Sequence, residues 1–192
     1  MLTLPINSPD TANIIGIDPG STNMGVSVIT INLVTLKIVS SIAWTINGAK
    51  LSDSDSWIAN LHGDRYSRIK ALEETLLQIF NYYQPIAVAG ESAFINGRFP
   101  AAVMALVEVM GAIRNAVTRY DVWRVVNLVP PSSAKNAVSA GGAANKDTMK
   151  EKVMQLTELN YNGNVPIHLL DEHSIDALAI GYYMYKKLLK GD

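Results

Sequence analysis

The first part of the chain is a series of short apolar runs separated by turn residues. Residues 13–18 (NIIGID) form a short, mostly apolar run that stops at Pro19-Gly20, which predicts a buried strand followed by a turn. Residues 24–33 alternate apolar with small or polar side chains, and 34–46 are rich in Val, Ile, Thr and Trp, so both segments are predicted strands. Because only short turns separate these three strands, they should pair antiparallel.

Helical periodicity alternates with apolar runs in the rest of the chain. Apolar residues recur at helical spacing between Arg65 and Pro85 and again after Pro100. Pro100 itself is favourable in the first turn of a helix. Gly141-Gly142 interrupts the pattern, and Asn145 is a candidate N-cap. Asp171 and Glu172 should cap the last helix and offset its dipole. The predicted strands cover 86–91 and 122–129, the predicted helices cover 65–82, 101–120, 132–139, 146–159 and 172–189, and 167–170 is expected to be extended.

This order of elements predicts an α/β fold. Strands that are separated by helices should lie parallel, so we expect a mixed five-stranded sheet, three antiparallel strands and then parallel ones, with helices on both faces. Residues 47–56 should form a polar loop, and 1–12, with two prolines, a loose lead-in. Since no linker or repeat divides the chain, residues 1–192 are expected to be one domain.

The composition excludes several classes of protein. With 48% apolar and 17% charged residues the chain is not a disordered one, and the absence of Cys excludes disulfide scaffolds, Cys-ligated zinc and thiol catalysis. Apolar runs fall short of the ~18 residues that span a bilayer, and no secretory signal pattern is present. We therefore expect a soluble protein without a membrane partner, cytoplasmic in a bacterial or phage-infected cell, with an organelle as the alternative.

The formal net charge of −1 is unevenly distributed along the chain. Residues 92–152 carry eight Lys or Arg and four Asp or Glu, a net charge of +4, whereas 1–91 and 153–192 carry −3 and −2. A near-neutral total therefore does not exclude a nucleic-acid partner. If cations offset the acidic ends, binding should depend strongly on metal and on salt.

Three carboxylates fall at the ends of predicted elements. Asp18 ends the first strand, Glu91 ends the fourth, and Asp176 lies near the start of the last helix, on the same face as His173. Considered alone, each residue has an ordinary structural explanation. Asp18 would form a turn, Glu91 and Asp176 would be exposed to solvent, and His173 would be a partly buried imidazole with its hydrogen bonds satisfied. Taken together, they would repel one another unless a divalent cation intervened, and oxygen ligands suit Mg²⁺ or Mn²⁺. Two such ions about 4 Å apart can drive phosphodiester hydrolysis.

Two stretches of the chain carry a family resemblance. They read IIGIDPGSTNMGVSVI from Ile14 and HSIDALAIGYYMY from His173. Together with GESAF, which holds Glu91 and Phe94, and with Lys135 and Lys146 eleven positions apart, they resemble the RuvC family of Holliday-junction resolvases. These are dimeric, metal-dependent nucleases of the ribonuclease H-like superfamily. The resemblance extends over about residues 13–185.

The resemblance implies a role for each matching residue. Lys135 and Lys146 would contact phosphates, Lys146 would also assist catalysis, and Phe94 would stack on an unpaired base. The helix over 101–120 would pack across the two-fold axis of a homodimer whose subunits each cut one strand of four-way branched DNA. Two Mg²⁺ or Mn²⁺ ions per subunit would be held by Asp18, Glu91, His173 and Asp176.

Two further residues are candidates for DNA contact because of where they lie. Arg98 follows Phe94 in the segment that leaves the fourth strand, and Lys150 lies one helical turn after Lys146. For Lys150 the alternative is a solvated helix face, and for Phe94 it is the core. The sequence does not identify a partner helicase.

The sequence departs from the family pattern at two points. His173 stands where many members carry Asp, which would shift the metal preference towards Mn²⁺, and residues 47–63 form a longer, more polar segment. Such divergence is compatible with a phage-type enzyme acting on other branched DNA. A sugar kinase or actin-like ATPase is excluded by the chain length. The remaining alternatives are a related nuclease or binding module for structured RNA, a ribosomal RNA processing nuclease, and a dimeric structural domain.

Overall fold

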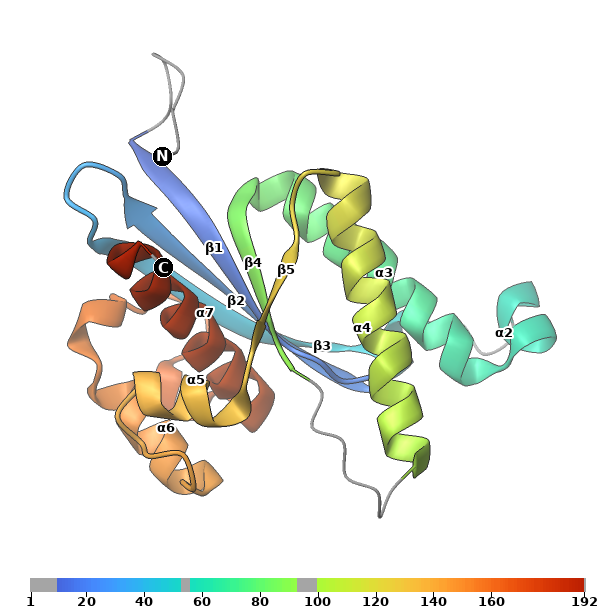
Figure 1. The fold of residues 1–192 in the computed structure, drawn as a ribbon. Coiled ribbons are helices and arrows are strands. Elements are labelled where there is room, and N and C mark those ends of the chain that lie inside the picture. Colours follow the sequence, from blue (N-terminus) through green and yellow to red (C-terminus); the bar gives the residue numbers. More distant parts are fainter. Residues whose placement is uncertain (1–9, 53–55, 93–99, 192) are drawn as a thin grey trace.

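The structure, a computed structural model, describes residues 10–52, 56–92 and 100–191 and is built on a five-stranded sheet (Figure 1). The strand order is β3-β2-β1-β4-β5. Strand β2 pairs antiparallel with β1 and β3, whereas β4 pairs parallel with β1 and β5. The predicted mixed sheet is therefore confirmed. The strands are β1 (Thr11–Asp18), β2 (Asn23–Asn32), β3 (Ile38–Asn47), β4 (Pro85–Glu91) and β5 (Val126–Val129).

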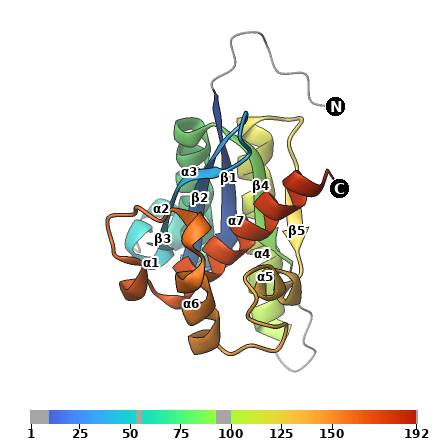
Figure 2. The same cartoon turned by 90° about the vertical axis from the view of Figure 1, so that its left-hand side faces the viewer.

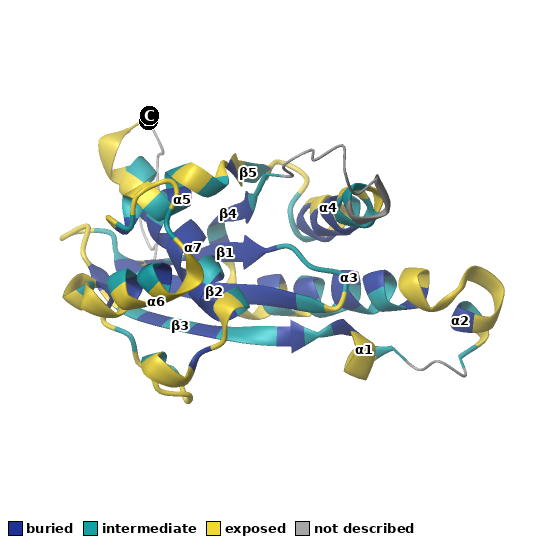
Figure 3. Ribbon diagram, turned by 90° about the horizontal axis from the view of Figure 1, so that it is seen from below, coloured by how far each residue is buried: buried dark blue, intermediate teal, exposed yellow. Residues whose placement is uncertain are grey.

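Helices cover both faces of the sheet, as predicted (Figures 2 and 3). Side chains alternate along each strand, so Ile14 joins one apolar core while Ile15 joins the other. The core that contains Ile14 is closed by α5 (Pro131–Ala137), α6 (Lys146–Gln155) and α7 (Glu172–Lys190). The core that contains Ile15 is closed by α3 (Asp64–Tyr83) and α4 (Pro100–Tyr120).

Helix α7 lies directly on β1 and β2, because two glycines leave room for its backbone. A Cβ at Gly16 would lie 2.3 Å from the carbonyl oxygen of Ala177, and one at Gly25 would lie 2.0 Å from that of His173. The hydroxyl of Ser27 donates to the same Ala177 oxygen at 2.7 Å. This close packing fixes the first turns of α7 over the end of the sheet at which β1 finishes.

Two strands begin later than predicted. The third strand starts at Ile38 rather than at residue 34, because the side chain of Asn32 accepts from the backbone N–H groups of Val34 and Thr35 and makes a turn. The fifth strand starts at Val126 rather than at residue 122, because Asp121 Oδ1 accepts from the Trp123 N–H in another turn. Trp123 is 91% exposed there.

Several helix boundaries also differ from prediction. The expected loop over 47–56 contains α1 (Gly48–Leu51), which the Asn47 side chain caps, and α2 (Trp57–His62) follows. The predicted helix over 146–159 ends at Gln155, since Leu156 leaves helical geometry, and the 3₁₀ turn η1 (Thr157–Leu159) follows. The expected extended link is the 3₁₀ turn η2 (Ile167–Leu169). Strand β1 begins at Thr11, inside the expected lead-in.

In the part of the chain that the structure describes, no helix is both long enough and apolar enough to cross a membrane. This agrees with the apolar runs in the sequence, which are all interrupted by polar residues.

Candidate active site

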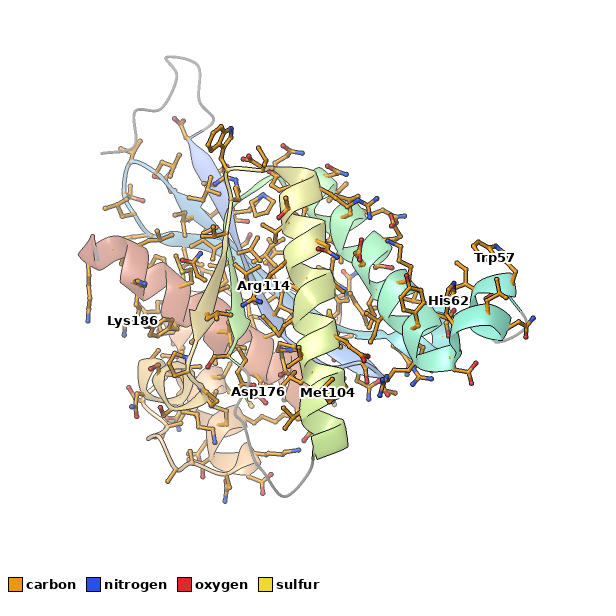
Figure 4. The ribbon with its side chains drawn as sticks, turned by 45° about the vertical axis from the view of Figure 1, so that its right-hand side comes forward. Trp57, His62, Met104, Arg114, Asp176 and Lys186 are labelled. Carbon is orange, nitrogen blue, oxygen red and sulfur yellow. The ribbon has the colours of Figure 1, made fainter. Side chains whose placement is uncertain are left out.

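Asp18 and Glu91 lie at the same edge of the sheet. Their strands β1 and β4 are parallel neighbours, with Ile17 opposite Gly90, and each strand ends on its acid. The sequence had placed both acids at strand ends but had left open whether those strands are adjacent. Figure 4 shows Asp176 on α7 at this end of the sheet. The three predicted carboxylates are therefore brought to one place.

His173 contacts the first of these carboxylates directly. Its Nδ1 lies 2.7 Å from Oδ2 of Asp18, within hydrogen-bonding distance. Asp18 is 9% exposed, so this contact is largely screened from water. His173 and Asp176 are three positions apart on α7, as the sequence indicated, and both face the sheet edge.

Burial, together with neighbouring negative charge, raises the pKa of each acid. Burial raises the pKa of Glu91 to about 7, helped by the charges of Asp18 and Asp176 and opposed by Lys135. Burial and the charge of Asp18 raise the pKa of Asp176 to about 6. Burial also raises the pKa of Asp18, although the hydrogen bond with His173 opposes the shift. At these three carboxylates, burial and neighbouring negative charge therefore outweigh the opposing effects of Lys135 and His173.

Both predicted lysines lie beside the acids. The positive charge of Lys135 lowers the pKa of both Glu91 and Asp176, and its Nζ donates to the carbonyl oxygen of Ala144 at 2.7 Å. Lys146 pairs with Glu172, which is the main reason that the pKa of Lys146 is raised. A cavity of about 290 Å³ beside them is lined in part by Lys146, Glu172 and Asp176.

Of the other residues predicted to contact DNA, the structure describes only Lys150. Lys150 donates from Nζ to the carbonyl oxygen of Leu170 at 2.8 Å, so it has a structural partner just before α7. Its role in DNA contact stays a prediction. Phe94 and Arg98 lie outside the described residues.

Sequence reasoning missed two residues that organise the site. Thr45 on β3 donates to Oδ1 of Asp171 at 2.6 Å, and the same oxygen accepts from the Ser174 N–H at 2.8 Å. Asp171 was predicted as a cap, but nothing in the sequence links it to Thr45, 126 positions earlier. The second residue is Glu172, the partner of Lys146; both residues lie in first helical turns, which is the only signal that the sequence offers.

The donor set suits a divalent cation. Carboxylate oxygens and one imidazole nitrogen are ligands for Mg²⁺ or Mn²⁺, and a cation would relieve the repulsion that raises the pKa of Glu91 and of Asp176. Among the described residues, no three Asp, Glu, His or Cys side chains converge into a ready-made coordination shell. The ligand chemistry therefore fits a metal, and the side chains would have to adjust to bind it.

The sheet topology and its structural relatives show a ribonuclease H-like fold. The fold is similar to that of Thermus thermophilus RuvC, with a TM-score of 0.65 and 19% identity over 93% of this chain and 96% of that one. It is also similar to the yeast mitochondrial Holliday junction resolvase Ydc2, with a TM-score of 0.62 and 14% identity over 94% and 81% of the chains. Another similar structure, also at a TM-score of 0.65, is T. thermophilus RuvC in complex with a Holliday junction substrate.

The family follows from the sequence comparison. A family model described as crossover junction endodeoxyribonuclease RuvC matches residues 14–182, so the chain belongs to the RuvC family. A relative of that description from Cereibacter sphaeroides is 30% identical over 167 residues, 87% of this chain and 85% of the relative. One from Rickettsia conorii is 28% identical over 88% of this chain and 94% of its own. The resemblance seen in the sequence is confirmed.

Proposed function

We propose that this chain is a metal-dependent endonuclease that resolves four-way (Holliday) junctions during DNA recombination and repair. The observation that carries the proposal is the gathering of Asp18, Glu91 and Asp176, from β1, β4 and α7, at one edge of the sheet in a RuvC-family chain. The similar fold of a RuvC that is bound to a Holliday junction substrate supports four-way DNA as the partner.

Under this proposal the four predicted ligands hold two divalent ions. Mg²⁺ is the expected ion, and the nitrogen of His173 makes Mn²⁺ a good alternative. Bound ions of this kind supply an activated water and offset charge on the phosphate. His173 would also position the Asp18 carboxylate in the metal-free protein through the contact between its Nδ1 and Asp18 Oδ2. The ligands are Asp18, Glu91, His173 and Asp176.

Lys146 is the residue that we propose contacts the phosphate to be cut. It is paired with Glu172 in an exposed ion pair, and exposed pairs contribute little to stability. A phosphate oxygen can therefore replace Glu172 as its partner at small cost. Lys135 also lies beside the acids and adds positive charge there. Phe94, Arg98 and Lys150 are proposed to contact the DNA around the branch point.

We propose a homodimer in which each subunit cuts one strand. Helix α4 supports it with an exposed apolar stripe: Met104 and Val107 are 56% and 54% exposed, and a Cβ at Gly111, one turn further, would meet nothing. A symmetric pair of sites matches a four-way junction, since two symmetric nicks resolve it. We also propose a cytoplasmic location, because a bacterial enzyme that acts on DNA must reach the chromosome.

The test is a cleavage assay on two substrates. Purified protein is incubated with a synthetic four-way junction or with linear duplex of the same sequence, in Mg²⁺, Mn²⁺ or EDTA. We expect paired symmetric nicks on the junction with either metal and none in EDTA. Equal cutting of the duplex would contradict the proposal, and cutting of other branched DNA at the same rate would reduce it to a general branch nuclease.

A further inference from the structure

A basic groove lies between α5 and the last turns of α7, away from the acidic site. The cavity measures about 440 Å³. Three lysines of α7 line one side of it, and polar side chains of the α5 region line the other. The lysines are Lys186, Lys187 and Lys190, and the polar residues facing them are Ser133, Asn136 and Ser139.

The charge of this groove is concentrated and uncompensated. Its three lysines are the only Lys or Arg residues in 153–192, a segment that is otherwise acidic. None of the described residues that line the groove is acidic, and none of these lysines has an ion-pair partner within the described part of the chain. The ammonium group of Lys186 lies 5.0 Å from the centre of the Tyr182 ring, which holds it without neutralising it.

Stabilising the end of the helix does not fully account for this arrangement. Lysines near a helix C-terminus interact favourably with the helix dipole, and Lys187 and Lys190 lie in the last turn of α7. The effect falls off within that turn and does not depend on what faces the side chains. Here three lysines line a cavity together with two hydroxyls and an amide, and all of these groups can donate to an anion.

The groove lies beside the same two helices, α5 and α7, that also contribute to the acidic site, but further along α7. Helix α5 faces both places, because its Lys135 acts on Glu91 and Asp176 while its Ser133 and Asn136 line the groove. On α7, Lys186 is ten residues after Asp176, which is about 15 Å along the axis, and Lys190 is about 21 Å away. Figure 4 shows Asp176 and Lys186 at separate points along α7.

We propose that this groove binds the phosphodiester backbone of one duplex arm of the junction, about four to six nucleotides from the bond that is cut. The spacing follows from the ~3.4 Å that each nucleotide of a strand advances along duplex DNA. The ammonium groups would pair with phosphate oxygens, and Ser133 and Asn136 would add hydrogen bonds. The proposal rests on the proposed junction-cutting function and adds a second binding site to it.

The first experiment measures junction binding as a function of salt. The protein carries D176N so that the DNA is not cut, and is compared with and without K186A/K187A/K190A. We expect the triple substitution to weaken binding about tenfold to hundredfold, and the slope of log affinity against log salt to become shallower by about 0.9 for each phosphate that the lysines no longer neutralise. Unchanged affinity and slope, with only a lower Tm, would overturn the proposal in favour of helix stabilisation alone.

Two variants serve as controls. K186R/K187R/K190R keeps the positive charge, so it should retain the affinity and the salt slope of the D176N protein. K152A removes a lysine whose amine already has Gln155 as a partner at 3.1 Å, and it should leave both quantities unchanged. A K152A effect as large as that of the triple variant would show only a general loss of charge and would overturn the assignment to this groove.

The second experiment changes the DNA and compares its effect on the intact and the altered groove. Junctions are made with neutral methylphosphonate linkages four to six nucleotides from the cut, and their binding is compared with that of unmodified DNA. We expect the neutral linkages to weaken binding by the D176N protein and to have little further effect on the triple variant. Equal effects on both, or none on either, would overturn the proposal. Failure of the unsubstituted chain to cut any junction would instead contradict the proposed function, so the two failures are distinguishable.

Discussion

At the scale of single residues, Glu91 and Asp176 are kept in an unfavourable setting. Burial and neighbouring charge raise their pKa values to about 7 and 6, so near neutral pH each ionised carboxylate costs folding free energy. Such a cost is expected where a site is built to bind a cation, because the bound ion offsets it. The site therefore contributes to function at the expense of the stability of the metal-free protein.

The pH dependence of this cost can be measured. The folded protein keeps the protons of Glu91 and Asp176 up to about pH 7 and 6, while the unfolded chain loses them near the ordinary values of 4.5 and 3.8. Stability is therefore lost as the pH rises between those limits. In EDTA, E91Q/D176N should raise Tm at pH 8 by about 2–4 °C for each kcal/mol of burial and repulsion cost removed, and much less at pH 4. A gain that is equal at both pH values would contradict this.

The metal ligands make a second prediction at this scale. D18N and D176N should each lower cleavage of a four-way junction by more than about 100-fold, since partners outside the first coordination shell alone contribute 10–100-fold. Junction binding should survive because the phosphate contacts remain. Gel-shift and cleavage assays on the same samples measure both quantities. If either variant cuts at the wild-type rate, the assignment of that ligand is wrong.

At the scale of elements, the site depends on how closely α7 packs on β1 and β2. The two shortest contacts of a Cβ added at Gly16 would be with backbone atoms of α7, which cannot move aside as a side chain can. We expect G16A to displace α7 and to lower the free energy of unfolding by about 1–3 kcal/mol, the usual effect of overpacking. Urea unfolding measures the change.

A glycine elsewhere provides the matched control. An added Cβ at Gly142, in the loop after α5, would approach no atom closer than Ser132 Cβ at 3.4 Å, an ordinary van der Waals contact, so G142A should be neutral or stabilise the fold by about 0.4–1 kcal/mol. Comparable destabilisation by G16A and G142A would show that the effect is not one of close packing.

The hydrogen bonds of Thr45 make a prediction about the same helix. T45V removes the hydroxyl that donates to Asp171 and contacts Ser174 at 3.0 Å, and so loosens the start of α7. We expect a loss of about 0.5–1.5 kcal/mol in the free energy of unfolding and a lower affinity for Mn²⁺ by calorimetry. T45S keeps the hydroxyl and should restore both. If T45V binds Mn²⁺ as tightly as the wild type, Thr45 does not position the site.

At the scale of the whole molecule, the exposed stripe of α4 predicts the oligomeric state. M104D/V107D should convert the proposed dimer to a monomer in analytical ultracentrifugation, because two buried carboxylates without partners are costly at an interface. Paired nicks should then become unpaired. V34D changes a valine that is 77% exposed in the β2–β3 turn and serves as the control. A dimer that survives M104D/V107D would place the interface elsewhere.

Much of the fold was predictable because it is encoded locally. Alternation of apolar residues predicted the strands, 3.6-residue periodicity predicted the helices, and Asn145 and Asp171 marked helix starts that the structure confirms. The errors lie where a single side chain decides the backbone. Asn32 turns the chain after β2, and Leu36 takes a positive φ of 58° within that turn, a conformation that an apolar pattern does not reveal.

The sequence by itself determined which residue types stand near the ends of which elements. Asp18 and Glu91 therefore close strands, and Asp176 lies near the start of a helix. Only the tertiary structure decided their neighbours. It placed β1 beside β4, joined Lys146 to Glu172, and gathered the α7 lysines opposite α5 in one groove. The physical reason is that burial and backbone preference are properties of neighbouring residues, whereas contacts between distant residues depend on how whole elements pack.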